Sequence, residues 1–164
     1  MSIVVTMTLI LGIDPGWKGA LAFLDPVSRK LITVSMPVEK RKNKKTYTDC
    51  AGVLQALDAV GHITEAWIED VYSSPQMGVV GAFSFGEGKG TLVGILAARG
   101  VPTRFVSPST WKAKLGVTRD KDLTKSFARA LFPQAGKNLS TEGKCEAALI
   151  AQYGALASIR FNSV

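Results

Sequence analysis

The sequence predicts an α/β fold built on a mixed five-stranded sheet that is flanked by helices. Three apolar segments near its start, separated by short turns, predict an antiparallel three-stranded meander. Helical and strand-like segments alternate after the meander, which is typical of the parallel part of a sheet. A length of 164 residues with 46% hydrophobic content is consistent with one domain spanning residues 1–164.

Each element of this fold is predicted from its own pattern. Short apolar segments bounded by Gly, Pro or Asp predict strands at residues 8–13, 19–24, 31–36, 66–69 and 101–106. Apolar residues at helical spacing predict helices at residues 48–59, 91–98, 119–132 and 141–158. Residues 71–85 are rich in Gly, Ser and Pro, so they predict an irregular connection.

Composition restricts the class of protein. An excess of 20 Lys and Arg over 13 Asp and Glu gives a net charge of +7, which favours a polyanionic partner such as nucleic acid. Cys50 and Cys145 are far apart and form no CxxC pair, so reduced thiols in a cytoplasmic protein are expected. No segment approaches the roughly 20 apolar residues that a membrane-spanning helix needs, and no membrane partner is expected.

Two acidic residues follow apolar strands. Asp14 ends the first predicted strand, and Glu69 ends the strand at residues 66–69. A carboxylate at the end of a buried strand is costly unless it is exposed, paired or bound to a cation. Asp14 alone also fits an ordinary Asp-Pro-Gly turn, and Glu69 a solvated strand end. Their joint occurrence favours a divalent-cation site, because such cations bind carboxylate oxygens.

A third acidic feature opens the last predicted helix. Glu142 and Glu146 are four residues apart, so they lie on one helical face. Glu142 also fits the first turn of any helix, where the dipole favours acidic residues. Glu146 has the apolar neighbours Cys145 and Ala147, which are unusual beside a fully solvated position. Glu146 is therefore the stronger candidate for a site residue.

Several motifs together resemble the RuvC family of Holliday junction resolvases. Residues 12–16 (GIDPG), followed by residues 19–22 (GALA), resemble the first acidic motif of that family, and residues 68–72 (IEDVY) resemble its second. Residues 145–151 (CEAALIA) resemble the acidic helix that completes the site. The segments FGEGKG and SPSTWK are most similar to the compact members from phages and prophages. The similarity covers nearly the whole chain.

The resemblance implies a ribonuclease-H-like fold and a metal-dependent endodeoxyribonuclease that cleaves four-way junctions, with other branched DNA as further substrates. It implies that Asp14 bridges two Mg²⁺ ions, that Glu69 holds one of them, and that Glu146 with Glu142 holds the other. Mn²⁺ is expected to substitute, and no small-molecule cofactor is expected. Lys144 would orient the scissile phosphate or assist the attacking water, although it also fits ordinary solvated surface.

One position departs from the family pattern. The family usually has an acid or a histidine three residues before the last carboxylate, and this chain has Gly143 there. Glu142 lies one residue earlier, about one helical turn from Glu146. We therefore expect Glu142 to replace the missing ligand. The only histidine, His62, is expected in a loop or at a helix end, away from the site.

DNA contacts are expected from basic and aromatic residues in three segments: Lys40, Arg41, Lys42, Lys44, Lys45, Tyr72, Lys112 and Lys114. The run from Lys40 to Lys45 fits a flexible solvated loop equally well. By the resemblance, Tyr72 falls where the family carries an aromatic that stacks on an unpaired base, and an ordinary packing tyrosine is the alternative. Trp111, beside Lys112, is expected to be partly in the core.

The resemblance also implies a homodimer, since a junction has two symmetric strands to cut. The candidate interface is the helix around residues 79–98. The alternative is that this helix only packs on the sheet. The expected location is the cytoplasm or nucleoid of a bacterial host, where a phage would also place such an enzyme. The main alternative is a non-catalytic or differently directed ribonuclease-H-like module of the YqgF type, whereas an actin-like ATPase would need a second domain.

Overall fold

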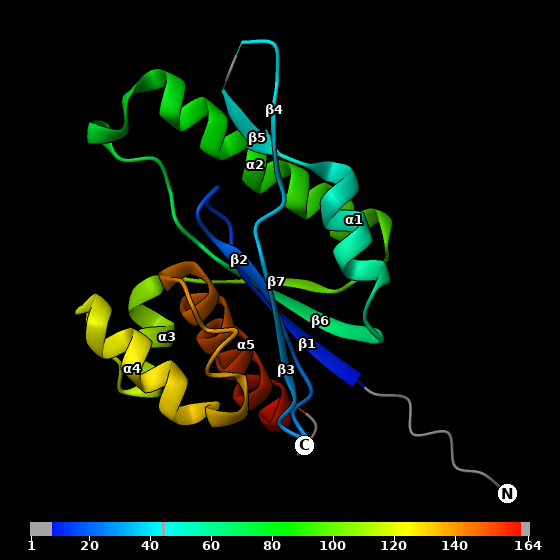
Figure 1. Ribbon diagram of the computed structural model, residues 1–164, viewed down its shortest axis with the longest axis vertical. Coiled ribbons are helices and arrows are strands. Elements are labelled where there is room, and N and C mark those ends of the chain that lie inside the picture. Colours follow the sequence, from blue (N-terminus) through cyan, green and yellow to red (C-terminus); the bar gives the residue numbers. More distant parts are fainter. Residues whose placement is uncertain (1–7, 44, 162–164) are drawn as a thin grey trace, which may run out of the picture.

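A mixed five-stranded sheet forms the centre of the molecule. The computed structural model describes residues 8–43 and 45–161, the last three as backbone only. The sheet has the strand order β3-β2-β1-β6-β7 (Figure 1). β1, β2 and β3 are antiparallel neighbours, whereas β6 pairs parallel with β1 and β7 parallel with β6. The strands are β1 (Thr8–Asp14), β2 (Ala20–Leu24), β3 (Leu31–Ser35), β6 (His62–Glu69) and β7 (Thr103–Val106). The predicted sheet is confirmed.

Helices cover both faces of this sheet (Figure 1). One face carries α3 (Pro108–Leu115), α4 (Lys121–Leu131) and α5 (Glu142–Phe161). The opposite face carries α1 (Cys50–Asp58) and α2 (Gly78–Ala98). Because both faces are covered, strands β1 and β2 are almost continuously apolar and buried rather than alternating in polarity. None of the described helices combines the length and apolar character that crossing a membrane requires.

Side chains of β1 point alternately to the two helical layers. Leu11 and Ile13 pack in the core beneath α1 and α2, whereas Ile10 packs in the core beneath α5. Gly12 faces α5 so closely that an added Cβ would lie 2.2 Å from the carbonyl oxygen of Ala147. The absence of a side chain at Gly12 therefore lets α5 approach the strand that ends in Asp14.

Three parts of the structure differ from the sequence-based expectation. The basic run is flanked by a two-stranded hairpin, β4 (Val38–Lys40) and β5 (Thr46–Thr48), and Lys44 lies outside the described residues. α2 begins at Gly78, so the expected irregular connection over residues 71–85 is wrong for its second half. α3 was not expected, and it starts with a Ser107 cap and a Pro in its first turn. Short 3₁₀ turns occupy Pro75–Met77 and Pro133–Ala135.

His62 also differs from its expected place. It is the first residue of β6, at the edge of the sheet opposite to Glu69, and it is exposed. Its pairing with Thr8 of β1 shows why a loop assignment fails: the parallel ladder extends to the start of β6. The histidine remains far from the acidic residues along that strand, as expected.

Candidate active site

The parallel pairing of β1 and β6 places Asp14 and Glu69 together. Gly12 pairs with Trp67 and Ile13 pairs with Ile68, so the next residues of the two strands are Asp14 and Glu69. Gly12 and Trp67 both face α5. Since side chains alternate along a strand, Asp14 and Glu69 point to the same face at the same edge of the sheet.

The first turns of α5 complete this acidic edge. Glu142 begins the helix, and Glu146 lies one turn further along it. Between them, Gly143 packs on the backbone of the β1–β2 turn, where an added Cβ would lie 2.4 Å from the carbonyl oxygen of Lys18. The departure from the family pattern therefore has a steric reason: no side chain fits at position 143 while this packing is kept.

An open cavity of about 580 Å³ lies beside these acids. Three of the predicted site residues, Asp14, Glu142 and Glu146, line it. Its remaining walls are the turn from Gly16 to Gly19, with Ser35, Lys121, Thr141 and Gly143. The cavity thus combines carboxylates with the ammonium groups of Lys18 and Lys121, a lining that suits a phosphate bound through a cation.

Burial raises the pKa of Asp14 to about 7, and the nearby charges of Glu146 and Glu69 add to the rise. The Gly16 N–H, 3.5 Å from Oδ1 of Asp14, opposes this rise in pKa. Burial also raises the pKa of Glu69, while a hydrogen bond from Trp111 counteracts the increase. Among the ion pairs of the described residues, none gives Asp14 a cationic partner. Crowded carboxylates of this kind are characteristic of catalytic and metal-binding sites.

Helix α3 provides partners for two of the acids. The indole N–H of Trp111, a fully buried side chain, donates to Oε1 of Glu69 at 2.9 Å. The ammonium group of Lys112 lies 3.0 Å from Oε1 of Glu146. Within residues 8–43 and 45–161, no three His, Cys, Asp or Glu side chains are arranged to hold a metal ion as they stand. Trp111 is wholly in the core, more deeply than expected.

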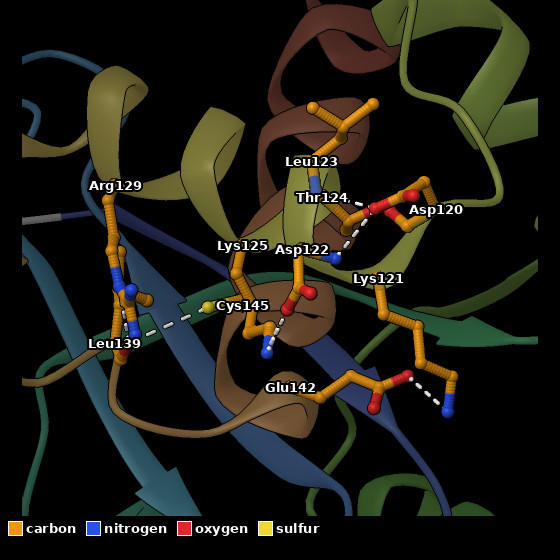
Figure 2. Close-up of polar contacts among 10 residues, drawn as sticks. All are labelled: Asp120, Lys121, Asp122, Leu123, Thr124, Lys125, Arg129, Leu139, Glu142 and Cys145. Atoms are coloured by element: carbon orange, nitrogen blue, oxygen red, sulfur yellow. Dashed lines mark hydrogen bonds and ion pairs between the residues drawn. The ribbon is translucent and has the colours of Figure 1, made fainter.

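Glu142 is held by a different helix. Figure 2 shows its carboxylate directed at Lys121, at the start of α4, with Nζ and Oε1 3.1 Å apart. Both side chains are substantially exposed, so this ion pair contributes little to stability and leaves Glu142 free to exchange partners. Neighbouring Lys125 is paired with Asp122 of its own helix instead (Figure 2).

The other predicted residues lie around this centre. Lys144 is half-buried in the first turn of α5 and does not line the cavity. Tyr72 is 77% exposed, and its hydroxyl donates to Asp70 at 2.8 Å. Lys114 is exposed on α3. Lys112, expected at a phosphate, binds Glu146 in this structure.

The basic side chains of the β4–β5 hairpin differ in whether their charge is compensated. Lys40 ends β4, and Lys42 and Lys45 are exposed. Arg41 forms ion pairs with Glu39 and Glu87, at 2.9 Å each, so its charge is already compensated. The hairpin lies beside α2, away from α3 and α5 (Figure 1).

Three residues of the site were not singled out from the sequence. Lys18 and Lys121 line the acidic cavity, and so does Trp17, with 61% of its surface exposed. The sequence does contain a signal for Trp17. This residue directly follows GIDPG in a glycine-rich turn, where a large apolar side chain has no core to enter. The contact of Lys121 depends on tertiary structure and left no signal.

Comparison with known proteins places this geometry in a familiar architecture. As a sequence, the chain matches no protein-family model, and a search of curated proteins gives no significant match. Among solved structures, it is similar to Thermus thermophilus RuvC in complex with a Holliday junction substrate, with a TM-score of 0.63 and 16% identity. That alignment covers 93% of this chain and 96% of the RuvC chain. The fold is that of RuvC.

Two further structures agree with the RuvC fold. Another Thermus thermophilus RuvC structure gives a TM-score of 0.57 at 18% identity, covering 93% of this chain and 96% of that one. The yeast mitochondrial Holliday junction resolvase gives 0.55 at 18% identity, covering 98% of this chain and 85% of that one. The RuvC fold thus accounts for more than nine-tenths of the chain, as the motif resemblance implied.

Proposed function

We propose that this chain is a structure-selective endonuclease that cleaves four-way DNA junctions by metal-dependent phosphodiester hydrolysis. One observation carries the proposal: Asp14 and Glu69 end adjacent parallel strands on the same face, and Glu146 approaches them from α5. The architecture in which they meet is the RuvC fold, and one of the similar structures contains a Holliday junction substrate. The net charge of +7 suits a nucleic-acid partner.

The donor set fits hard divalent cations, Mg²⁺ first and Mn²⁺ as a substitute, because every candidate ligand is a carboxylate. Bound there, such ions would neutralise the phosphate, activate water and stabilise the leaving oxygen. Asp14 and Glu69 would be ligands from the sheet, and Glu146 and Glu142 would be ligands from α5. On binding a metal ion, Glu146 would release Lys112. The ammonium group of Lys112 would then be free to contact the scissile phosphate. Lys144, outside the cavity, is better placed to contact an adjoining phosphate.

The proposal includes a homodimer and a wider DNA-binding surface. Val79 and Phe83 expose apolar surface on α2, with 88 and 72% of their surface accessible, which is unusual for a helix without a partner. Lys40, Lys42, Lys45 and Lys114 are exposed and would contact DNA phosphates, while Tyr72 would stack at the crossover. A single nuclease domain acting on DNA in a bacterial cytoplasm or nucleoid fits these features.

The deciding experiment compares cleavage of a synthetic four-way junction, a fork and linear duplex with and without Mg²⁺. Paired incisions that require Mg²⁺ and favour the junction are expected, with 5′-phosphate ends. Asp14→Asn should abolish the incisions while junction binding persists, since the acids and the phosphate contacts are separable. Equal cutting of linear duplex, or cleavage by Asp14→Asn, would contradict the proposal.

A non-catalytic nucleic-acid-binding module is the second candidate. It is favoured by the pairing of Glu146 with Lys112, which compensates the charge of one candidate metal ligand. Such a module would bind the junction and leave it intact at any Mg²⁺ or Mn²⁺ concentration. Calorimetry that detects no binding of Mn²⁺ to the protein would support the same conclusion independently of activity.

A further inference from the structure

Trp17 is presented to the exterior directly beside the acidic cavity. It occupies a tight turn in which the N–H of Gly19 donates to the carbonyl of Gly16 at 2.8 Å, so Trp17 and Lys18 are the central residues. Their side chains therefore point away from the sheet, and Trp17 is 61% exposed. The two other tryptophans of the chain, Trp67 and Trp111, are 7 and 0% exposed and belong to the core. Burial does not explain the choice of tryptophan at this position.

Trp17 separates two cavities. It lines the acidic cavity together with Asp14 and Glu146, and it also lines a second cavity of about 470 Å³. The second cavity lies between the turn, the β4–β5 hairpin and α2, and its walls include Tyr47, Met77, Val80 and Phe85. Its volume is within the range of roughly 300–1,000 Å³ that holds small organic groups.

Positive charge surrounds this aromatic surface. The ammonium group of Lys18 lies over one face of the Trp17 ring, 4.7 Å from its centre, which leaves the other face for a base, and Lys45 lines the second cavity. A flat aromatic face flanked by lysines is complementary to a nucleotide, in which a π-surface is attached to a negatively charged phosphate. A purely apolar partner would gain nothing from these charges.

We propose that Trp17 stacks on an unstacked nucleobase of the DNA strand to be cut, which enters the second cavity while its neighbouring phosphate lies over the acids. This inference rests on the proposed function, because it needs a strand at Asp14. Trp17 is three residues from Asp14 and lines both cavities, so the base site would adjoin the acids.

The test uses four-way junctions carrying 2-aminopurine at single positions on either side of the crossover, bound in metal-free buffer so that no strand is cut. Wild-type protein should alter the emission at one position. Trp17→Ala should lose this signal and bind roughly 5- to 150-fold more weakly, the range expected for one base-aromatic stack. Trp17→Phe should retain most of both. Phe127→Ala serves as the matched control, because Phe127 is an exposed aromatic on α4 outside both cavities.

Wild-type binding and emission from Trp17→Ala would overturn the proposal, as would Trp17→Phe behaving like Trp17→Ala. Acrylamide quenching of the wild-type protein does not depend on any variant folding. Because Trp17 is the exposed tryptophan, it supplies the fluorescence that acrylamide can quench. Bound DNA should reduce this quenching. Protection that grows with protein concentration in the absence of DNA would instead show that a second copy of the chain covers Trp17, and would overturn the proposal.

Failure of the stacking proposal is distinguishable from failure of the proposed function. Cleavage of unlabelled junctions by the wild-type protein with Mg²⁺ is measured in parallel. Cleavage combined with no effect of Trp17→Ala on binding or emission rejects stacking and retains the endonuclease. A Trp17-dependent emission change without any cleavage would show that Trp17 stacks on a base although no strand is cut, which rejects the endonuclease and, with it, the position of the base beside a cut.

Discussion

The carboxylate of Asp14 is partly buried close to Glu146 and Glu69, and burial raises its pKa to about 7, well above the ordinary value of 3.8. The folded protein therefore holds this proton more tightly than the unfolded chain does. The contribution of Asp14 to the free energy of unfolding is complete below about pH 4, and it falls as the pH rises from about 4 to about 7. The decline is at most about 1.4 kcal/mol per pH unit, and charge coupling and residual solvent reduce it.

Replacing Asp14 with Asn should remove this pH-dependent cost. In EDTA at pH 8, we expect Asp14→Asn to have a higher Tm than the wild type, because the amide avoids burying a third negative charge. At pH 5 the difference should shrink, since Asp14 is then protonated. Mg²⁺ added at pH 8 should raise the wild-type Tm and leave that of Asp14→Asn nearly unchanged. Scanning calorimetry across pH and Mg²⁺ checks this, and equal Tm values at pH 8 would contradict it.

Glu142 and Gly143 can be tested as a pair. If Glu142 is the fourth ligand, Glu142→Gln should lower cleavage by orders of magnitude and raise the Mg²⁺ concentration required, because an amide binds a hard cation weakly. If it is only a first-turn acid, the change costs about 1 kcal/mol of stability or less. Gly143→Asp, the family-like residue, should fail to compensate, since its Cβ would displace the backbone of Lys18 and Gly19. Rescue of Glu142→Gln by Gly143→Asp would refute this interpretation of the packing.

Trp111 should act on metal binding through Glu69. Trp111→Phe keeps the buried ring but removes the N–H donor, so the pKa of Glu69 should rise further and Mg²⁺ should bind more weakly at pH 7. Raising the pH should restore part of the affinity. Trp67→Phe is the matched control, because its indole N–H donates to Glu65, outside the site. Mn²⁺ titration by calorimetry separates the two variants, and an identical reduction in both would indicate a general packing effect.

Among the helices and strands, the hydrophobic pattern predicted the elements in which several apolar residues recur at a regular spacing. The meander, β6, β7, α4 and α5 each carry several apolar residues at the right period, so their existence followed from the sequence. α2 contains six of the chain's glycines, which weaken helix propensity, and only its second half shows a recognisable pattern. The short strands β4 and β5 and the eight-residue α3 contain too few apolar residues for a period to be recognised, although Ser107, Pro108 and Gly116 mark the ends of α3.

The site was predictable only in part, for a related reason. Asp14, Glu69 and Glu146 follow from strand ends and a helix face, which are local features. The pairing of Lys112 with Glu146 and of Trp111 with Glu69 joins residues that are distant in sequence. The steric block at Gly143 likewise depends on how closely α5 approaches the β1–β2 turn. Contacts of this kind have no counterpart in spacing or composition.

The β4–β5 hairpin is expected to contribute to DNA affinity mainly through Lys42 and Lys45, because Arg41 is already paired with Glu39 and Glu87. The double substitution Lys42→Gln and Lys45→Gln should weaken junction binding. It should also flatten the plot of log K against log salt, by about 0.9 for each phosphate that the protein no longer neutralises. Lys30→Gln, an exposed lysine in the β2–β3 turn, is the control. An unchanged salt slope would show that the hairpin is solvated surface.

For the whole molecule, the exposed face of α2 predicts the state of association. We expect Val79→Asp combined with Phe83→Asp to convert a dimer into monomers, since charges at the centre of an apolar interface are strongly unfavourable. Sedimentation equilibrium measures the change. Val27→Asp, at an 86% exposed residue in the β2–β3 turn, should leave association unaffected. A wild-type protein that is monomeric at all concentrations would contradict the expectation.

The packing of α5 against β1 has a consequence for synthesis. β1 leaves the ribosome well before β6 and α5, yet it pairs in parallel with β6 and is covered by α5. Such long-range contacts close late and slow folding. A nascent chain that has not yet released α5 lacks Glu146 opposite Asp14, so it has no complete acidic site. On the proposed function, the ability to cut DNA would therefore arise only after α5 has left the ribosome and packed on β1.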